Sequence, residues 1–173
     1  MSSPFSLPAT LNPPLNGREA VADTMYRCAM AFDTCDADLF DSTFMEDGVF
    51  DVNGRAMKGL PEIHATGLTI IFKVDTTHMV TNMRVNMKPR KSAAGAVEEP
   101  NEASLTATVL SQHYAYGKGM EPSQKSLMSG SLYRGELAKD TDGLWKFTHL
   151  GAKSTWAEGD WGVIGGSFND VEE

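Results

Sequence analysis

Residues 76–87 read Thr-Thr-His-Met-Val-Thr-Asn-Met-Arg-Val-Asn-Met, and polar and apolar side chains alternate along most of this stretch. A period of two sends neighbouring side chains to opposite faces of an extended chain, so the segment is predicted to be a β-strand with one buried face. The same period recurs in residues 103–116, 126–137 and 144–150. The second half of the chain therefore predicts a curved antiparallel sheet of long strands.

The residues before this sheet show a helical period instead. Between residues 18 and 32, apolar side chains recur at steps of three and four, which predicts an amphipathic helix. Asp36 is placed to cap a short second helix. Leu60-Pro61 is placed to open a third, because proline suits the first turn of a helix. Residues 49–52 predict an additional first strand, after a turn at residues 46–48.

Three N-terminal helices followed by a sheet with one apolar face per strand predict an α+β fold in which the helices cover the sheet. Residues 1–16 are broken by four prolines and lack the basic start of a signal peptide, so they are expected to form an extended arm. A single domain is expected over residues 17–165, followed by an acidic tail over 166–173.

Composition argues against several function classes. The 173 residues carry 15 Lys and Arg against 23 Asp and Glu, a net charge of −8, and the basic cluster at residues 88–91 lies in a predicted loop over 88–102. We therefore expect no nucleic-acid partner. No apolar run is long enough to span a membrane, so no membrane partner is expected. Cys28 and Cys35 could pair in principle, but reduced thiols in a cytoplasmic protein fit their spacing better.

Several segments together carry a resemblance to a known family. They are Ala-Phe-Asp-Thr-Cys-Asp (31–36), Phe-Met-Glu-Asp-Gly-Val-Phe (44–50), Thr-Thr-His-Met-Val-Thr-Asn (76–82) and Asp-Gly-Leu-Trp-Lys-Phe (142–147). In this order the chain resembles the SnoaL-like family of the nuclear transport factor 2-like superfamily, and most of all its scytalone dehydratase type. The resemblance implies a cone-shaped sheet covered by helices, open at one end to a small organic molecule. Fold alone does not fix function in such a family.

The resemblance brings Asp33 and His78 together as the leading catalytic pair. A carboxylate that accepts one imidazole N–H fixes the tautomer and leaves the other nitrogen free to take a proton. The expected separation is a hydrogen bond, about 2.6–3.2 Å. The alternative is that Asp33 merely ends the first helix and that His78 is an ordinary, satisfied polar residue.

His113 is similar to a second pocket histidine of the dehydratase type, where it would donate a proton or stabilise an oxyanion. Strand alternation places it on one face with Val109 and Ser111, but the sequence leaves open whether that face lines the cone.

Some site positions depart from the dehydratase type. Phe32 and Val52 stand where that type has tyrosines, so a hydroxyl would have to come from elsewhere. Tyr26, Tyr114, Tyr116 and Tyr133 are candidates, and Ser131 and Tyr133 align with polar pocket residues of the family. Residues expected to contact substrate are Phe32, Val52, Tyr116, Ser131, Tyr133 and Trp161.

Two functions remain open at this stage. The first is a lyase or isomerase that acts without a cofactor on a hydrophobic polyketide- or terpenoid-derived molecule, by dehydration, isomerisation or cyclisation. The second is a pocket that binds or shapes its ligand without proton transfer, as a template for a pericyclic reaction. No metal site is expected, because no close-spaced cluster of ligating residues occurs. The substrate and the subunit number are not readable from the sequence.

Two further expectations concern surfaces. The face of the sheet that the helices leave bare would expose apolar side chains, so a homo-oligomer (dimer or trimer) is expected. The tail segment 156–164 carries Trp156 and Trp161 among glycines, and is expected to close the pocket. The alternative is that these tryptophans complete the core or a subunit contact.

Overall fold

The computed structural model describes residues 4–92 and 95–165. The helical segments are α1 (Gly17–Thr34), α2 (Ala37–Asp41), α3 (Leu60–Glu62), the π-helical turn η1 (Ile63–Leu68), α4 (Thr69–Ile71) and the 3-10 turn η2 (Trp161–Ile164). The strands are β1 (Phe44–Val52), β2 (Arg55–Lys58), β3 (Val74–Met87), β4 (Arg90–Lys91), β5 (Val97–Glu98), β6 (Glu102–Ala115), β7 (Ser126–Lys139) and β8 (Trp145–Gly159). The predicted α+β fold is confirmed.

Six strands form one curved sheet in the order β2-β1-β8-β7-β6-β3. The long strands β3, β6, β7 and β8 pair antiparallel, as the alternation predicts. The pairing of β1 with β8 is parallel, which the expectation of a wholly antiparallel sheet did not include. Strand β1 follows the first two helices in the chain. It joins the sheet beside β8, which is the outermost of the four long antiparallel strands. The result is a mixed sheet dominated by antiparallel pairs.

The turn expected at residues 46–48 is instead part of β1. The register between β1 and β8 shifts between Phe44 and Val49, so the strand bulges at this point. A Cβ on Gly48 would lie 2.8 Å from the carbonyl oxygen of Phe147, so the bulge needs a glycine where the two backbones approach. The expectation of a turn was wrong because the glycine marks an irregularity within the strand.

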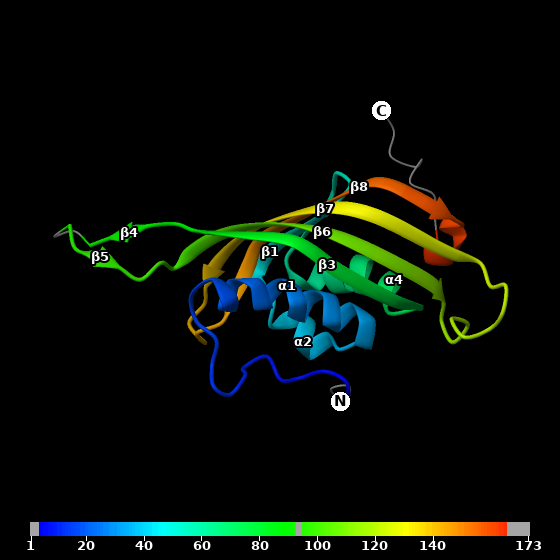
Figure 1. Ribbon diagram of the computed structural model, residues 1–173, viewed down its shortest axis with the longest axis horizontal. Coiled ribbons are helices and arrows are strands. Elements are labelled where there is room, and N and C mark those ends of the chain that lie inside the picture. The colour runs from blue at the N-terminus through cyan, green and yellow to red at the C-terminus, as the bar shows by residue number, and fades with distance from the viewer. Residues whose placement is uncertain (1–3, 93–94, 166–173) are drawn as a thin grey trace.

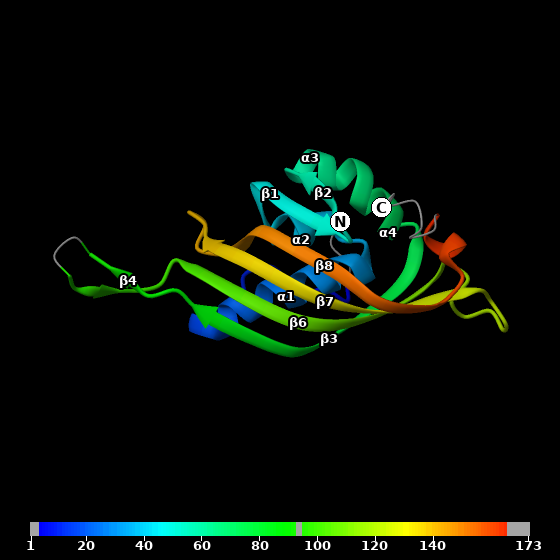
Figure 2. The same cartoon turned by 90° about the horizontal axis from the view of Figure 1, so that it is seen from above.

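The helices gather on one face of the sheet and leave the other bare, as Figures 1 and 2 show. We call the helix-covered face inner and the bare face outer. Helix α1 packs chiefly on β3. Asp36 caps α2 as predicted, because its carboxylate accepts a hydrogen bond from the Leu39 amide at 3.0 Å. The third helical region contains the π turn η1, a feature that the sequence pattern did not predict.

Aromatic rings fill the core between the helices and the inner face. Phe40 lies 5.1 Å from Phe44, which lies 5.4 Å from Phe147, as measured between ring centroids. Phe32 joins this group through Phe40 at 5.4 Å. These separations are typical of favourable aromatic pairs, so α1, α2, β1 and β8 are held together by one continuous cluster.

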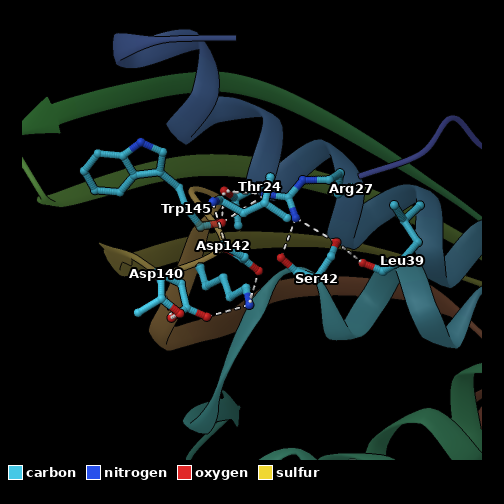
Figure 3. Close-up of polar contacts among 10 residues, drawn as sticks. Thr24, Arg27, Leu39, Ser42, Asp140, Asp142 and Trp145 are labelled. Carbon is cyan, nitrogen blue, oxygen red and sulfur yellow. Dashed lines mark hydrogen bonds and ion pairs between the residues drawn. The ribbon is translucent and has the colours of Figure 1, made fainter. Parts of the chain in front are cut away.

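A buried arginine of α1 also connects this helix to the segment after α2 and to the start of β8, through polar contacts (Figure 3). The Arg27 side chain is 6% exposed and pairs with Asp23 at 2.8 Å. Its guanidinium donates to the Ser42 carbonyl at 2.5 Å and to the Trp145 carbonyl at 3.0 Å. Thr24 also donates to the Trp145 carbonyl, at 2.9 Å. Helix α1 is therefore joined through hydrogen bonds to the start of β8 and to the segment between α2 and β1.

Residues 88–102 differ from the expected irregular loop. They include the two-stranded ribbon β4–β5, which extends away from the body of the molecule in Figure 1. Ion pairs join Arg90 to Glu98 at 2.9 Å and Lys88 to Glu102 at 3.4 Å. Arg90 and Glu98 stand opposite each other in the ribbon, and such opposite charges favour the pairing of its strands.

The N-terminal arm lies along the helices, and regular structure begins at Gly17. Ala9 packs against the core, and the Ser6 hydroxyl donates to the Asp36 carboxylate at 2.9 Å. The proposed tail over 166–173 lies outside the described residues. Within the described ranges, no helix combines the length and apolar character needed to cross a membrane.

Candidate functional site

The Asp33 carboxylate accepts two hydrogen bonds from His78. Its Oδ1 accepts from Nδ1 of the ring at 2.7 Å, and its Oδ2 accepts from the backbone amide at 2.9 Å. The ring distance lies within the range expected from the sequence. The side chains are 6% exposed for His78 and 19% for Asp33. Because Nδ1 carries the proton that is donated to the carboxylate, Nε2 of His78 holds a lone pair and can accept a proton.

The end of α1 positions this carboxylate. Cys35 adopts a left-handed conformation with φ of 53°, and its amide donates to the carbonyls of Ala31 and Phe32, which closes the last turn. Asp33 therefore sits at the end of a helix that is packed on β3, the strand that carries His78. The Phe32 ring lies 5.2 Å from the His78 ring and covers it on the side of the core.

His113 lies on the inner face of β6 and is 7% exposed, which answers the question that strand alternation left open. Its Nδ1 donates to the Leu127 carbonyl at 3.2 Å. Its ring stands edge-on to that of His78, with centroids 5.7 Å apart. Burial, and then the proximity of His78, lowers the pKa of His113.

The tautomer of His113 corrects its expected role. A neutral ring that donates from Nδ1 holds a lone pair on Nε2, so at neutral pH this nitrogen accepts rather than donates. His113 is thus not a resting proton donor. It can orient a hydroxyl of a bound molecule, or accept a proton from one.

Strand register adds hydroxyl groups that sequence reasoning missed. Thr76 stands directly opposite His113, and Ser111 stands opposite His78, with Ser129 next to Ser111 on β7. Both serines are buried. Thr76 and Ser111 each lie two residues from a histidine, so strand alternation could have found them, whereas Ser129 requires knowing which strands pair and in what register.

The expected substrate contacts are spread along the inner face. Ser131 is buried, and its hydroxyl is 3.1 Å from that of Ser154 on β8. Tyr133 is buried, and burial, followed by the nearby Cys28, raises its pKa. Val52 shares a row across the sheet with Tyr133, four residues along β7 from Ser129, and packs against the core. Of the expected contact residues, Phe32 has a ring contact with the His78–Asp33 pair.

The two other expected contact residues lie differently. Trp161 is half-buried in η2, which contacts β6 and β7. Tyr116 follows the end of β6 and is 71% exposed, so the structure does not bring it to the histidines. It lies beyond the strand, three residues after His113.

Trp156 also corrects part of the expected closing segment. A Cβ on Gly130 would overlap the indole at 2.3 Å, so the ring of Trp156 lies over that glycine. Gly130 alternates with the inward-facing Ser129 and Ser131, which places the indole on the outer face. Residues 156–159 belong to β8, so within the expected closing segment 156–164 it is η2 that remains as a candidate cover for the site.

Two hollows among the described residues lie away from the histidines. A groove of about 770 Å³ on the outer face is lined by Asp51, Asn82, Thr108, Leu132, Arg134 and Lys153, among others. A pocket of about 200 Å³ lies between the N-terminal arm, α1 and the start of β8. Neither is lined by His78 or His113. Over residues 4–92 and 95–165, no three His, Cys, Asp or Glu side chains are grouped to hold a metal ion.

Helices over a curved sheet, with a buried His–Asp pair on the inner face, define an α+β protein of the nuclear transport factor 2-like class. The chain belongs to the SnoaL-like domain family, which it matches over residues 13–151. It is 44% identical over 166 residues to the terrestric acid biosynthesis cluster protein E of Penicillium crustosum, covering 95% of this chain and 99% of that one.

Solved structures show the same fold. The hexachlorocyclohexane dehydrochlorinase LinA-type3 of Novosphingobium barchaimii is 19% identical, with 87% of this chain and 94% of that chain covered and a TM-score of 0.62. A scytalone dehydratase-like protein of Novosphingobium aromaticivorans is 17% identical, with 82% and 85% covered and a TM-score of 0.64. At these identities the likeness shows the fold alone.

Proposed function

We propose that this protein is a lyase or isomerase that removes a proton from a small organic molecule of secondary metabolism. The observation that carries the proposal is the buried Asp33–His78 pair, in which the carboxylate holds Nδ1 and leaves Nε2 as a base. The similarity to a protein of the terrestric acid biosynthesis cluster supports a substrate from such a pathway. The aromatic surroundings of His78 favour a largely apolar substrate.

The proposed step moves one proton and no net electrons. Nε2 of His78 takes a proton from a carbon next to a carbonyl, and the electron pair of the broken C–H bond passes to the carbonyl oxygen as an enolate. Asp33 stabilises the imidazolium that forms. The enolate then either takes the proton back at another carbon, which is isomerisation, or expels a β-hydroxyl, which leaves as water with the proton from His78. General acid–base catalysis contributes about 10²–10⁴-fold, so the C–H bond must already be acidic.

A probe reaction tests the base without knowledge of the substrate. In 5-nitrobenzisoxazole, removal of a carbon-bound proton breaks the N–O bond and releases a coloured cyanonitrophenolate. We expect the wild-type protein to accelerate this ring opening and His78→Ala to lose about 100-fold of the acceleration, within the range of general base catalysis. His149→Ala is the matched control, because His149 is exposed on the outer part of β8. Equal rates for wild type and His78→Ala would count against the proposal.

One observation favours a second function. Phe32 and Val52 place apolar side chains where the dehydratase type has phenols, and Phe32 contacts His78 directly. A site that shapes its ligand as a template, without proton transfer, would use such walls. With the natural substrate in hand, His78→Ala separates the two functions, because a template would lose only a few-fold in rate.

A further inference from the structure

One buried hydroxyl on the inner face has no partner. Within the part of the chain that the structure describes, Oγ1 of Thr76 is the buried side-chain oxygen or nitrogen for which no hydrogen bond is found. A buried hydroxyl without a partner costs free energy, so such groups in native proteins are expected to meet water or a ligand. The position of Thr76 indicates whether water or a ligand is the hydrogen-bond partner of this hydroxyl.

Thr76 adjoins both imidazoles. It lies two residues before His78 on the same face of β3, a spacing of about 7 Å along a strand. It is also the residue directly opposite His113 in the β3–β6 pairing. The hydroxyl and the two rings, whose centroids are 5.7 Å apart, therefore form one polar group on the inner face, next to Ser111.

The three groups differ in what they can offer. His78 and His113 each use Nδ1–H within the protein, towards Asp33 and towards the Leu127 carbonyl, so both present a lone pair on Nε2. Two acceptors cannot hold an oxygen on which negative charge develops. A hydroxyl donor can, and Thr76 has one that no protein atom uses.

Other candidate donors are placed less well. Phe32 and Val52 carry no hydroxyl, Tyr26 is 51% exposed and Tyr116 is 71% exposed. The Ser131 hydroxyl already contacts Ser154 at 3.1 Å. The hydroxyl of Ser111, opposite His78, is the nearest rival and enters the test below.

We propose that Thr76 donates the hydrogen bond that holds the substrate's carbonyl oxygen while His78 removes a proton. The inference rests on the proposed function and narrows the substrate class. The substrate presents a carbonyl or enol oxygen to Thr76 and an acidic C–H to Nε2 of His78, and it can offer a hydroxyl to Nε2 of His113. β-Hydroxy ketones and 1,3-dicarbonyl compounds have this arrangement.

Binding of two matched probes tests the donor separately from the base. The anion of 4-nitrophenol resembles an enolate, and nitrobenzene has the same ring and nitro group without the oxygen. We expect the full-length protein, at a pH where the phenol is ionised, to bind 4-nitrophenolate more tightly than nitrobenzene. Thr76→Val keeps the side-chain shape and should weaken phenolate binding about tenfold, while nitrobenzene binding changes less than twofold. Thr76→Ser should keep the preference, and so should Thr77→Val, an exposed threonine on the opposite face.

The melting temperature of Thr76→Val distinguishes a ligand-binding hydroxyl from one that supports the fold. Thr76→Val replaces an unpartnered hydroxyl with a methyl group, so the melting temperature should stay equal or rise. A clear fall would mean that the hydroxyl supports the fold, which would overturn the proposal. A wild-type protein without preference for the phenolate would overturn it too, as would loss of the preference in Ser111→Ala but not in Thr76→Val. The role of His78 as a base is tested separately, by the rate of benzisoxazole opening in His78→Ala. The two experiments therefore distinguish a failure of the proposed base from a failure of the proposed donor.

Discussion

The carboxylate of Asp33 fixes both the backbone and the ring of His78, with one oxygen on the amide at 2.9 Å and the other on Nδ1 at 2.7 Å. The end of α1 and the middle of β3 are therefore locked to each other at the residue that would perform chemistry. Such a two-point contact sets the ring orientation as well as the tautomer, which is what a positioned base requires.

Asp33→Asn should separate orientation from charge. The amide is nearly isosteric and can still accept from the His78 backbone, so the melting temperature should change little. It cannot stabilise an imidazolium, and its NH₂ group favours the wrong tautomer, so the rate of benzisoxazole opening should fall about 100-fold. Asp38→Asn, at an exposed carboxylate of α2, serves as control. A retained rate in Asp33→Asn would show that the pair is only structural.

The lowered pKa of His113 makes a prediction about stability and pH. Its folded-state pKa lies below the ordinary value of 6.5, so below about pH 6.5 the unfolded chain binds a proton that the folded chain does not. The contribution of His113 to the free energy of unfolding should therefore be complete above this pH and should decline as the pH falls. Urea titrations at pH 8 and at pH 5.5 should show a smaller decline for His113→Gln than for wild type. An equal decline would place the acid sensitivity elsewhere.

The sequence predicts the fold well where a local pattern has one physical outcome. Asp36 caps α2, and the alternation of residues 76–87 yields β3. It fails where the outcome depends on distant partners. Gly48 bulges against the Phe147 carbonyl, a contact between segments about one hundred residues apart, and so it resembles a turn when only its neighbours are considered.

The site shows the same division. The pairing of Asp33 with His78 could be anticipated from the motifs of a family, and the distance agrees. The face on which His113 lies, its tautomer and the isolation of the Thr76 hydroxyl all depend on sheet register and on the Leu127 carbonyl. No local property of the sequence encodes these.

The Arg27–Asp23 pair offers a test of how the helices are held. Arg27→Met should destabilise the protein by about 3–5 kcal/mol, because Asp23 loses its partner, the Ser42 carbonyl loses a donor and the Trp145 carbonyl loses one of its two donors. Adding Asp23→Leu removes the uncompensated charge and should recover part of the loss. Chemical denaturation of the two single variants and the double variant measures the coupling. Additive effects would mean that the ion pair itself contributes nothing.

The exposed apolar side chains of the outer face lead us to predict self-association. It exposes Leu132 at 54%, Met79 at 43% and Trp156 at 49%, and carries the groove of about 770 Å³. We propose that a second copy covers this face in a homo-oligomer. Light scattering at micromolar concentration should give a multiple of the chain mass, and Leu132→Glu should reduce it to one chain while leaving the circular dichroism unchanged. A monomeric wild-type protein would contradict the proposal.

The last prediction is that η2 covers the candidate site. This turn contacts β6 and β7, and it follows Gly159 of β8, which pairs with Leu127 of β7, the residue that pairs with His113 of β6. Its first residue follows Asp160, whose carboxylate accepts from the Gly162 amide at 2.8 Å and pairs with Lys125 at 2.6 Å. The polar cap and the ion pair hold the turn against the β6–β7 connection, and Trp161 at its start supplies an apolar surface that can exclude water.

Truncation after Asp160 is the appropriate test, because it keeps all of β8, whereas a cut after Ser154 would remove residues that pair with β7. We expect the shortened protein to stay folded, with a melting temperature within a few degrees of wild type, and kcat/KM for benzisoxazole opening to fall at least tenfold. Trp161→Ala should reproduce most of the loss, while Trp156→Ala, on the outer face, should not. If kcat/KM is unchanged, η2 does not cover the site, and if the shortened protein unfolds, Trp161 belongs to the core instead.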